Sequence, residues 1–133
     1  MYNSQQIKDY TLFNDFRDLL RAEFNLRSRN NSKYTLGAFA RRLGLSSSHV
    51  HEILNARYGI SRTMAVKIAE KLKFSEIKTQ YFCDLVESQH GRSEINRKLA
   101  LLRLVELKEK THFQKLKYLR LNSLVHHTSD RIE

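Results

Sequence analysis

The chain has 133 residues, a formal net charge of +10 at pH 7, no proline and one cysteine. This length predicts one domain with, at most, an appended element. The excess of basic over acidic residues indicates a polyanionic partner or an anionic membrane surface. No apolar run of about 18 residues is present, which excludes a membrane-spanning helix. The lone Cys83 excludes an intrachain disulfide and indicates a reducing compartment, and the opening segment MYNSQQIKDY lacks the pattern of a secretory signal, so we expect a cytoplasmic protein.

The first predicted element is a helix from about Lys8 to Arg29, followed by a polar loop over 27–33. Its apolar residues fall on one wide face, while charged residues occupy the other face, as in an amphipathic surface helix. The residues of the apolar face are Leu12, Phe13, Phe16, Leu19, Leu20 and Phe24.

Residues 36–55, LGAFARRLGLSSSHVHEILN, carry the most specific pattern in the chain. Apolar residues recur at i, i+3, i+4 and i+7 from Leu36 to Leu43, which predicts an amphipathic helix. Ala40 supplies a small side chain where two helices cross, and Gly44 falls where a sharp turn favours a positive φ. The remaining signals are Val50 and Ile53, which return a second helix to the first, and the predicted N-caps Thr35 and Ser46.

This spacing resembles that of the Cro/repressor-type (xenobiotic-response-element-like) helix-turn-helix family. Residues 55–61 resemble the loop that follows the recognition helix in that family, and residues 61–72 resemble its next helix. The region from about residue 10 to 89 is also similar to the N-terminal region of uncharacterised two-domain regulators described from predatory bacteria. The residues that suggest this second likeness are RRLGLSSS at 41–48 and, later, Glu76, Tyr81, Phe82, Leu85 and Val86.

Two further helices are expected before residue 91. One covers about 63–72, and the next runs from a Ser75 N-cap to about His90. Cys83 lies outside the apolar progression of that last helix, and we interpret it as core filler rather than a nucleophile. The predicted core-facing residues of the last helix are Ile77, Tyr81, Phe82, Leu85 and Val86.

Gly91 marks the clearest boundary, which divides the chain into a domain at 8–90 and an extension at 91–133, with Ser93 as the cap of the next helix. The extension is leucine-rich over more than one helical face, so it requires apolar partners on more than one side. It is therefore either a dimerisation arm or a sixth core helix, and the sequence does not choose between them. We expect a helix break at 111–114, a capping-box pattern, and a frayed end from His126 to Glu133.

The resemblance implies that the start of the second helix of the motif reads bases in the major groove. Carried over position by position, this role falls to Ser47, Ser48, His51 and Glu52. Serine hydroxyls discriminate weakly, whereas His51 suits a guanine acceptor and Glu52 a cytosine amino group. The chain departs from the family at Leu36, where a glutamine usually opens the first helix of the motif and adds a polar contact near the phosphates.

Five further side chains are interpreted as contacts to the DNA backbone, which set affinity and register without reading sequence. The alternative is that the two arginines of the first motif helix are ordinary solvated charges. The five residues are Arg41, Arg42, Asn55, Arg57 and Arg62.

Catalytic and metal-binding patterns are missing from the sequence. His51-Glu52 begins like the zinc-protease motif, but the position four residues after His51 is Asn55, so the second histidine ligand is lacking. His49 and His51 lie on different sides of a helix and cannot share an ion. Glycine-rich phosphate loops and a nucleophile elbow are also absent. We therefore expect no enzyme activity, no cofactor and no metal.

These observations predict an all-α protein: a five-helix Cro/repressor-like helix-turn-helix domain followed by a leucine-rich helical arm. The predicted function is sequence-selective binding of double-stranded DNA by a nucleoid-associated, dimeric bacterial transcriptional regulator, because one short helix reads few base pairs. Homodimerisation through the C-terminal helix is expected. Two alternatives stay open: sequence-nonspecific DNA binding as a nucleoid protein, and a protein–protein adaptor that uses the leucine-rich arm.

Overall fold

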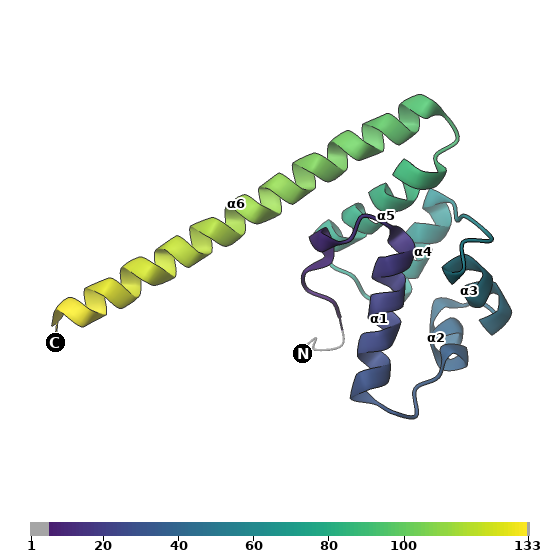
Figure 1. Cartoon of the computed structure of the whole chain (residues 1–133), viewed down its shortest axis with the longest axis horizontal. Helices are drawn as coiled ribbons and strands as arrows, with labels where there is room; N and C mark the ends of the chain where they lie inside the picture. Colours follow the sequence, from purple (N-terminus) through teal and green to yellow (C-terminus); the bar gives the residue numbers. More distant parts are fainter. Residues whose placement is uncertain (1–5, 133) are drawn as a thin grey trace.

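The computed structural model describes residues 6–132, with side chains described as far as residue 124. This part of the chain is entirely helical, as the sequence predicted. Five helices gather into one body, and the sixth crosses it and continues beyond it as a long projection (Figure 1). The elements are η1 (Tyr10–Leu12), α1 (Phe16–Asn30), α2 (Leu36–Leu43), α3 (Ser47–Leu54), α4 (Arg62–Lys71), α5 (Glu76–His90) and α6 (Glu94–Ile132).

The first long helix begins later than expected. Residues 10–12 form a short 3-10 turn, and the α-helix starts at Phe16 instead of near Lys8. Asp15 is the cause, because its side chain accepts a hydrogen bond from the backbone N–H of Arg17 at 2.8 Å and so forms an N-cap. Leu12 lies outside the helix and is 77% exposed, so its assignment to the apolar face was wrong.

The predicted helix–turn–helix is confirmed in its two N-caps, its turn and its buried residues. Thr35 Oγ1 accepts from the Ala38 N–H at 3.1 Å and caps α2, and Ser46 Oγ accepts from the His49 N–H at 3.1 Å and caps α3. Gly44 has φ +75°, the left-handed conformation that glycine adopts at low cost. Ala40, Val50 and Ile53 are buried where the two helices meet.

Helices α2, α3 and α4 all end in a left-handed residue, but only α2 uses glycine there. In each case the next N–H bonds back across the last turn: Leu45 to Ala40, Arg57 to Glu52 and Phe74 to Ala69, at 2.9–3.0 Å. The left-handed residues of α3 and α4 are Ala56 (φ +63°) and Lys73 (φ +59°). An L-residue is strained in this conformation, so the chain carries strain at both positions.

The core-facing side of α5 differs from expectation at one position. Tyr81, Phe82 and Leu85 are buried as predicted, but Ile77 is 40% exposed and the neighbouring Lys78 is buried instead. Lys78 turns inward because its ammonium group bonds to the fully buried carboxylate of Glu23 on α1 and donates to the Ile7 carbonyl at 2.7 Å. Burial lowers the pKa of Lys78, while Glu23 opposes that shift.

Arg27 completes this ionic cluster, which fastens α1, α5 and the N-terminal segment together. Its Nη1 donates to Glu23 Oε2 at 2.7 Å, one helical turn away. Nearby, Tyr81 donates its hydroxyl hydrogen to the Phe13 carbonyl at 2.7 Å, and burial raises the pKa of Tyr81 to about 12. Buried charges are stable only when paired in this way.

The first part of α6 packs on its own domain. Ala100 and Leu104 are buried against α5, Leu107 is half-buried, and Arg103 donates to the buried Asp84 carboxylate at 3.0 Å. The expected break at 111–114 does not occur, and α6 is one helix of 39 residues. Of the segment expected to fray, residues 126–132 belong to this helix, and Glu133 lies outside the described residues.

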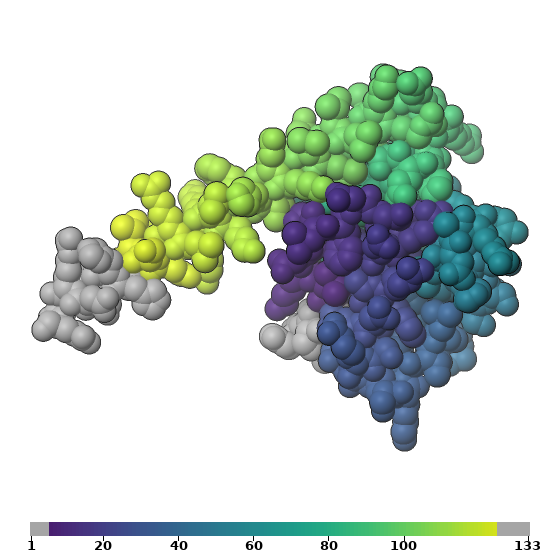
Figure 2. Space-filling model, viewed as in Figure 1, coloured from purple at the N-terminus to yellow at the C-terminus, as the bar shows by residue number. Residues whose placement is uncertain are grey.

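Beyond its docked part, α6 projects away from the body (Figure 2). Both the docked and the projecting parts of α6 expose large apolar side chains. The sixth-helix alternative therefore describes only the beginning of α6, while the apolar surface expected of a dimerisation arm remains. The exposed apolar residues of α6 include Ile95, Leu99, Leu101, Leu102, Val105, Phe113, Leu116, Tyr118, Leu119 and Leu121.

Replacing Ala56 by glycine should stabilise the protein. The substitution removes the left-handed strain of an L-residue, about 1 kcal/mol, and part of that gain is offset by the greater entropy of unfolded glycine. We expect a net gain of about 0.5 kcal/mol, measured by urea unfolding followed by circular dichroism. The matched control, Ala22→Gly inside α1, should lose about 0.5–1 kcal/mol; a loss of the same size for Ala56→Gly would contradict this account.

Candidate nucleic-acid interface

The four predicted base-reading residues share one side of α3. Ser47, Ser48 and His51 are exposed and Glu52 is half-buried. Helical periodicity places these four positions opposite Val50, Ile53 and Leu54, which are buried in the core. The structure therefore presents one continuous polar side of α3 to solvent.

A hydrogen bond on this exposed side determines which ring nitrogen of His51 carries the hydrogen. The Asn55 side-chain amide lies 2.9 Å from His51 Nε2. An amide N–H is a donor only, so Nε2 accepts and the hydrogen of the neutral ring is on Nδ1. His51 therefore offers Nδ1–H as a donor to an external acceptor, and Asn55 is drawn toward the polar side of α3.

Two arginines of α1 hold the C-terminal end of α3. Arg17 is 8% exposed, and its Nε donates to the Ile53 carbonyl at 2.8 Å. Arg21 Nη2 donates to the Leu54 carbonyl at 2.6 Å. The last carbonyls of a helix lack partners within the helix and carry partial negative charge, so two guanidinium groups satisfy them and complement the helix dipole.

Arg17 also fixes the loop that follows α3. Its Nη2 donates to the Tyr58 carbonyl at 3.0 Å and to His90 Nε2 at 3.2 Å. Because arginine only donates, His90 accepts at Nε2 as a neutral ring. Gly59 packs tightly against this histidine, since a Cβ at Gly59 would lie 2.7 Å from His90 Nδ1. The loop backbone therefore packs directly against the His90 side chain of α5, with no room for a side chain at position 59.

Asn55 and Arg57, the two loop residues predicted to contact phosphate, lie directly after α3 and are exposed. Tyr58 beside them is 54% exposed, and its ring contacts the His49 ring edge-on with centroids 6.4 Å apart. The structure thus brings the polar side of α3 and this loop into one surface.

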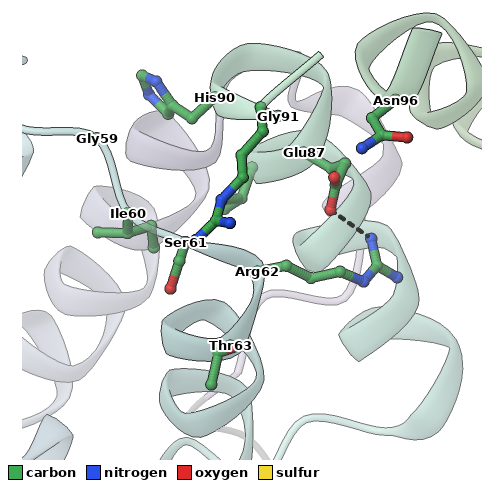
Figure 3. Close-up of a pocket in the computed structure, with 11 residues that line it drawn as sticks. Gly59, Ile60, Ser61, Arg62, Thr63, Glu87, His90, Gly91 and Asn96 are labelled. Carbon is green, nitrogen blue, oxygen red and sulfur yellow. Dashed lines mark hydrogen bonds and ion pairs between the residues drawn. The ribbon is translucent and has the colours of Figure 1, made fainter.

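Arg62 differs from the other predicted phosphate contacts because it is already paired. Its Nη1 lies 2.9 Å from the buried Asp84 carboxylate and 3.5 Å from Glu87. Figure 3 shows the Arg62 side chain extending toward Glu87 beside a hollow of about 500 Å³. Asp84 also binds Arg103, so Arg62 joins α4 to α5 and, through Asp84, to α6. This internal role argues against Arg62 as a free phosphate contact.

Arg41 and Arg42 lie apart from the loop after α3. Both line a second hollow with Arg27 and Lys73, and Arg42 Nε donates to the Lys71 carbonyl at 3.3 Å. The loop is held by Arg17, ten residues before Arg27 on the same helix, which is about 15 Å along the axis. The predicted phosphate contacts therefore form two separate groups.

Sequence reasoning missed the residues that position α3. Arg17 and Arg21 look like ordinary charges on the polar side of α1, and nothing in the sequence relates them to carbonyls more than 30 residues away. His90 is missed for the same reason, because its neighbours Arg17 and Gly59 are distant in the chain.

Within the described residues, no three histidine, cysteine or acidic side chains are grouped so as to hold a metal ion. No helix in the same part of the chain is long and apolar enough to cross a membrane. Cys83 is buried in the core, and burial raises the pKa of its thiol.

One family model matches part of the chain. Residues 27–77 match the family model described as helix-turn-helix, which includes α2, α3, α4 and the loop after α3. The match supports the resemblance to Cro/repressor-type proteins and DNA binding by this segment. It does not extend to the regulators of predatory bacteria, and that likeness stays a prediction. No curated protein and no solved structure gives a significant match.

Removing the guanidinium of Arg17 should destabilise the fold strongly. Arg17→Met keeps the aliphatic stem but leaves the Ile53 and Tyr58 carbonyls without their donor, at an expected cost of about 2–4 kcal/mol by urea unfolding. The matched control Arg21→Met removes the single hydrogen bond from the exposed Arg21 side chain to the Leu54 carbonyl and should cost about 1 kcal/mol. Equal costs for the two variants would show that Arg17 has no special role.

His90 should make the protein less stable in acid. Partial burial and the charge of Arg17 lower the pKa of His90, with Asp15 opposing them. The unfolded state therefore binds the proton more readily, and stability falls as the pH drops from about 6.5 through the folded-state pKa. We expect the fall in Tm between about pH 7 and pH 5 to be smaller in His90→Gln than in the parent protein. Parallel pH profiles would contradict the assignment.

Proposed function

We propose that the protein is a transcriptional regulator that binds specific double-stranded DNA sites by placing α3 in the major groove. The observation that carries the proposal is the polar side of α3, whose four polar side chains are directed away from the core by Val50, Ile53 and Leu54. A major groove admits one α-helix, and side chains on its outer side reach base edges. The helix-turn-helix match over 27–77 supports the same function.

Base discrimination is assigned mainly to His51 and Glu52. His51 Nδ1–H is a donor suited to guanine O6 or N7, because Nε2 is engaged by Asn55. The Glu52 carboxylate accepts from a cytosine amino group. Ser47 and Ser48 donate or accept equally well and therefore add contacts with little discrimination.

Backbone contacts are assigned to Asn55 and Arg57 beside α3, with Arg41 and Arg42 as a second group on α2. Arg57 is exposed and follows the C-terminal turn of α3, whose position Arg17 fixes. A phosphate contact at this point holds α3 in register with the groove without reading sequence.

We further propose that the protein acts as a homodimer through α6. An apolar surface of this extent is unusual on a monomer, and a helix with apolar residues around its circumference needs partners on several sides. The docked part of α6 turns Ile95, Leu99 and Leu102 outward, at 60%, 43% and 60% exposure. A second copy would cover these residues and provide two α3 helices for two half-sites.

The DNA assignment predicts distinct effects for two variants. On a site selected from a random duplex pool, His51→Ala should weaken binding by about 1–3 kcal/mol and relax specificity at one base pair. Arg57→Gln should weaken binding to all sequences and reduce the salt slope by about one unit. Fluorescence anisotropy at several salt concentrations measures both effects.

Two outcomes of that measurement would select an alternative function. Equal affinity of the parent protein for selected and random duplexes would indicate a nonspecific nucleoid protein, which the net charge of +10 also suits. Binding that is unchanged in both variants would indicate that α3 serves protein contacts.

The dimer assignment predicts that Leu116→Glu shifts the protein toward monomer in sedimentation-velocity experiments. A carboxylate at this exposed apolar position would be buried unpaired in a dimer interface, which is costly. The matched control is Asn122→Asp, about 120° around the same helix from Leu116 and on the side that carries Thr111 and Lys115, and it should leave the mass unchanged. A parent protein that sediments as a monomer at micromolar concentration would contradict the proposal.

A further inference from the structure

A basic hollow lies between the C-terminal end of α1, the outer side of α2 and the end of α4. Its volume is about 430 Å³, and four of its lining side chains are cations while none is acidic. We propose that this hollow binds a phosphate group. The lining of the hollow includes Arg27, Tyr34, Arg41, Arg42 and Lys73.

Arg27 forms the rigid part of the hollow. It is 9% exposed, and both of its hydrogen bonds to Glu23 come from Nη1, at 2.7 Å and 3.1 Å. Its Nε and Nη2 have no hydrogen-bond partner among the described residues, so the guanidinium retains donors for a ligand. A planar guanidinium held in place by one edge is well arranged for a phosphate oxygen pair.

The charge of this region is not balanced internally. Glu23 is the carboxylate that pairs with Arg27, and it also pairs with Lys78. One carboxylate therefore pairs with two cations, and Arg41, Arg42 and Lys73 add three more positive charges at the hollow. Positive charges that converge on a concave surface concentrate the field there, and a phosphate would relieve their mutual repulsion.

Lys73 occupies its place at a conformational cost. It has φ +59° at the end of α4, where the equivalent position after α2 is glycine. The Gln6 side chain donates to the Leu72 and Lys73 carbonyls at 3.0 Å and 2.9 Å and holds this corner. A strained residue that keeps a charged side chain in a hollow supports a functional role for that charge.

Arg42 and Tyr34 add further donors at the rim. Arg42 uses Nε for the Lys71 carbonyl at 3.3 Å, which anchors the side chain, and Tyr34 contributes a hydroxyl-bearing ring to the lining. A phosphate group carries up to two negative charges and three acceptor oxygens, which this set of donors matches.

The phosphate has two possible sources: the DNA backbone or a free phosphate-bearing molecule. The hollow lies near Arg27, about 15 Å along α1 from Arg17, which holds the loop after α3. A DNA source would add a second backbone contact and rests on the proposed function. A free source does not depend on it.

The test titrates the full-length protein with inorganic phosphate and pyrophosphate at constant ionic strength, followed by amide shifts in ¹⁵N NMR spectra. The double variant Arg41→Gln/Lys73→Gln should weaken saturable binding at least tenfold, while Lys115→Gln, which removes an exposed charge on the projecting part of α6, should not change it. Lys73→Gly gives a second signature: it should raise Tm because strain is relieved, and at the same time weaken phosphate binding.

A parallel arm measures duplex affinity of the same variants. Saturable phosphate binding with duplex affinity unchanged in the double variant would assign the hollow to a free phosphate. A uniform loss of duplex affinity with a smaller salt slope would assign it to the DNA backbone. The proposal is overturned if neither phosphate nor duplex binding changes in the double variant. The effect of Arg57→Gln on duplex affinity, measured alongside, separates that result from failure of DNA binding at α3.

Discussion

The structure depends on the contact between Arg17 and the C-terminal end of α3. An eight-residue helix is not stable alone in water, and its position is set by what it packs against. Arg17 bonds to the Ile53 carbonyl, the Tyr58 carbonyl and His90, so one buried guanidinium joins α1, α3, the following loop and α5. The polar side of α3 and the Arg57 loop therefore occupy one surface because a single side chain positions both.

Two other buried charges extend this arrangement through the body. Glu23 binds Arg27 and Lys78 and so links α1 to α5, while Asp84 binds Arg62 and Arg103 and links α5 to α4 and α6. Breaking a buried pair leaves an uncompensated charge, so each acidic residue penalises any other packing of its helices. The basic surface charges stay available for an anionic partner because these carboxylates are used internally.

Local signals predicted most of the fold, and long-range charge pairing accounts for the errors. Thr35, Gly44 and Ser46 act within a few residues of their own positions, so the sequence alone identified the motif correctly. Ile77 was assigned incorrectly to the core because Lys78 turns inward in its place, and the pairing of Arg62 with Asp84 was not foreseen; no local pattern reveals either contact. The phosphate contact of Arg62 stays a prediction. The late start of α1 follows from the Asp15 cap, a local signal that the long apolar pattern outweighed in the prediction.

The most direct test of the central claim is ¹⁵N NMR mapping of the protein surface that contacts a selected DNA duplex. We expect the largest amide shifts on residues 47–52 and 55–59, with α5 and the projecting part of α6 nearly unchanged. Contact confined to α6, with α3 and the loop after it unaffected, would show that the surface held by Arg17 does not bind DNA.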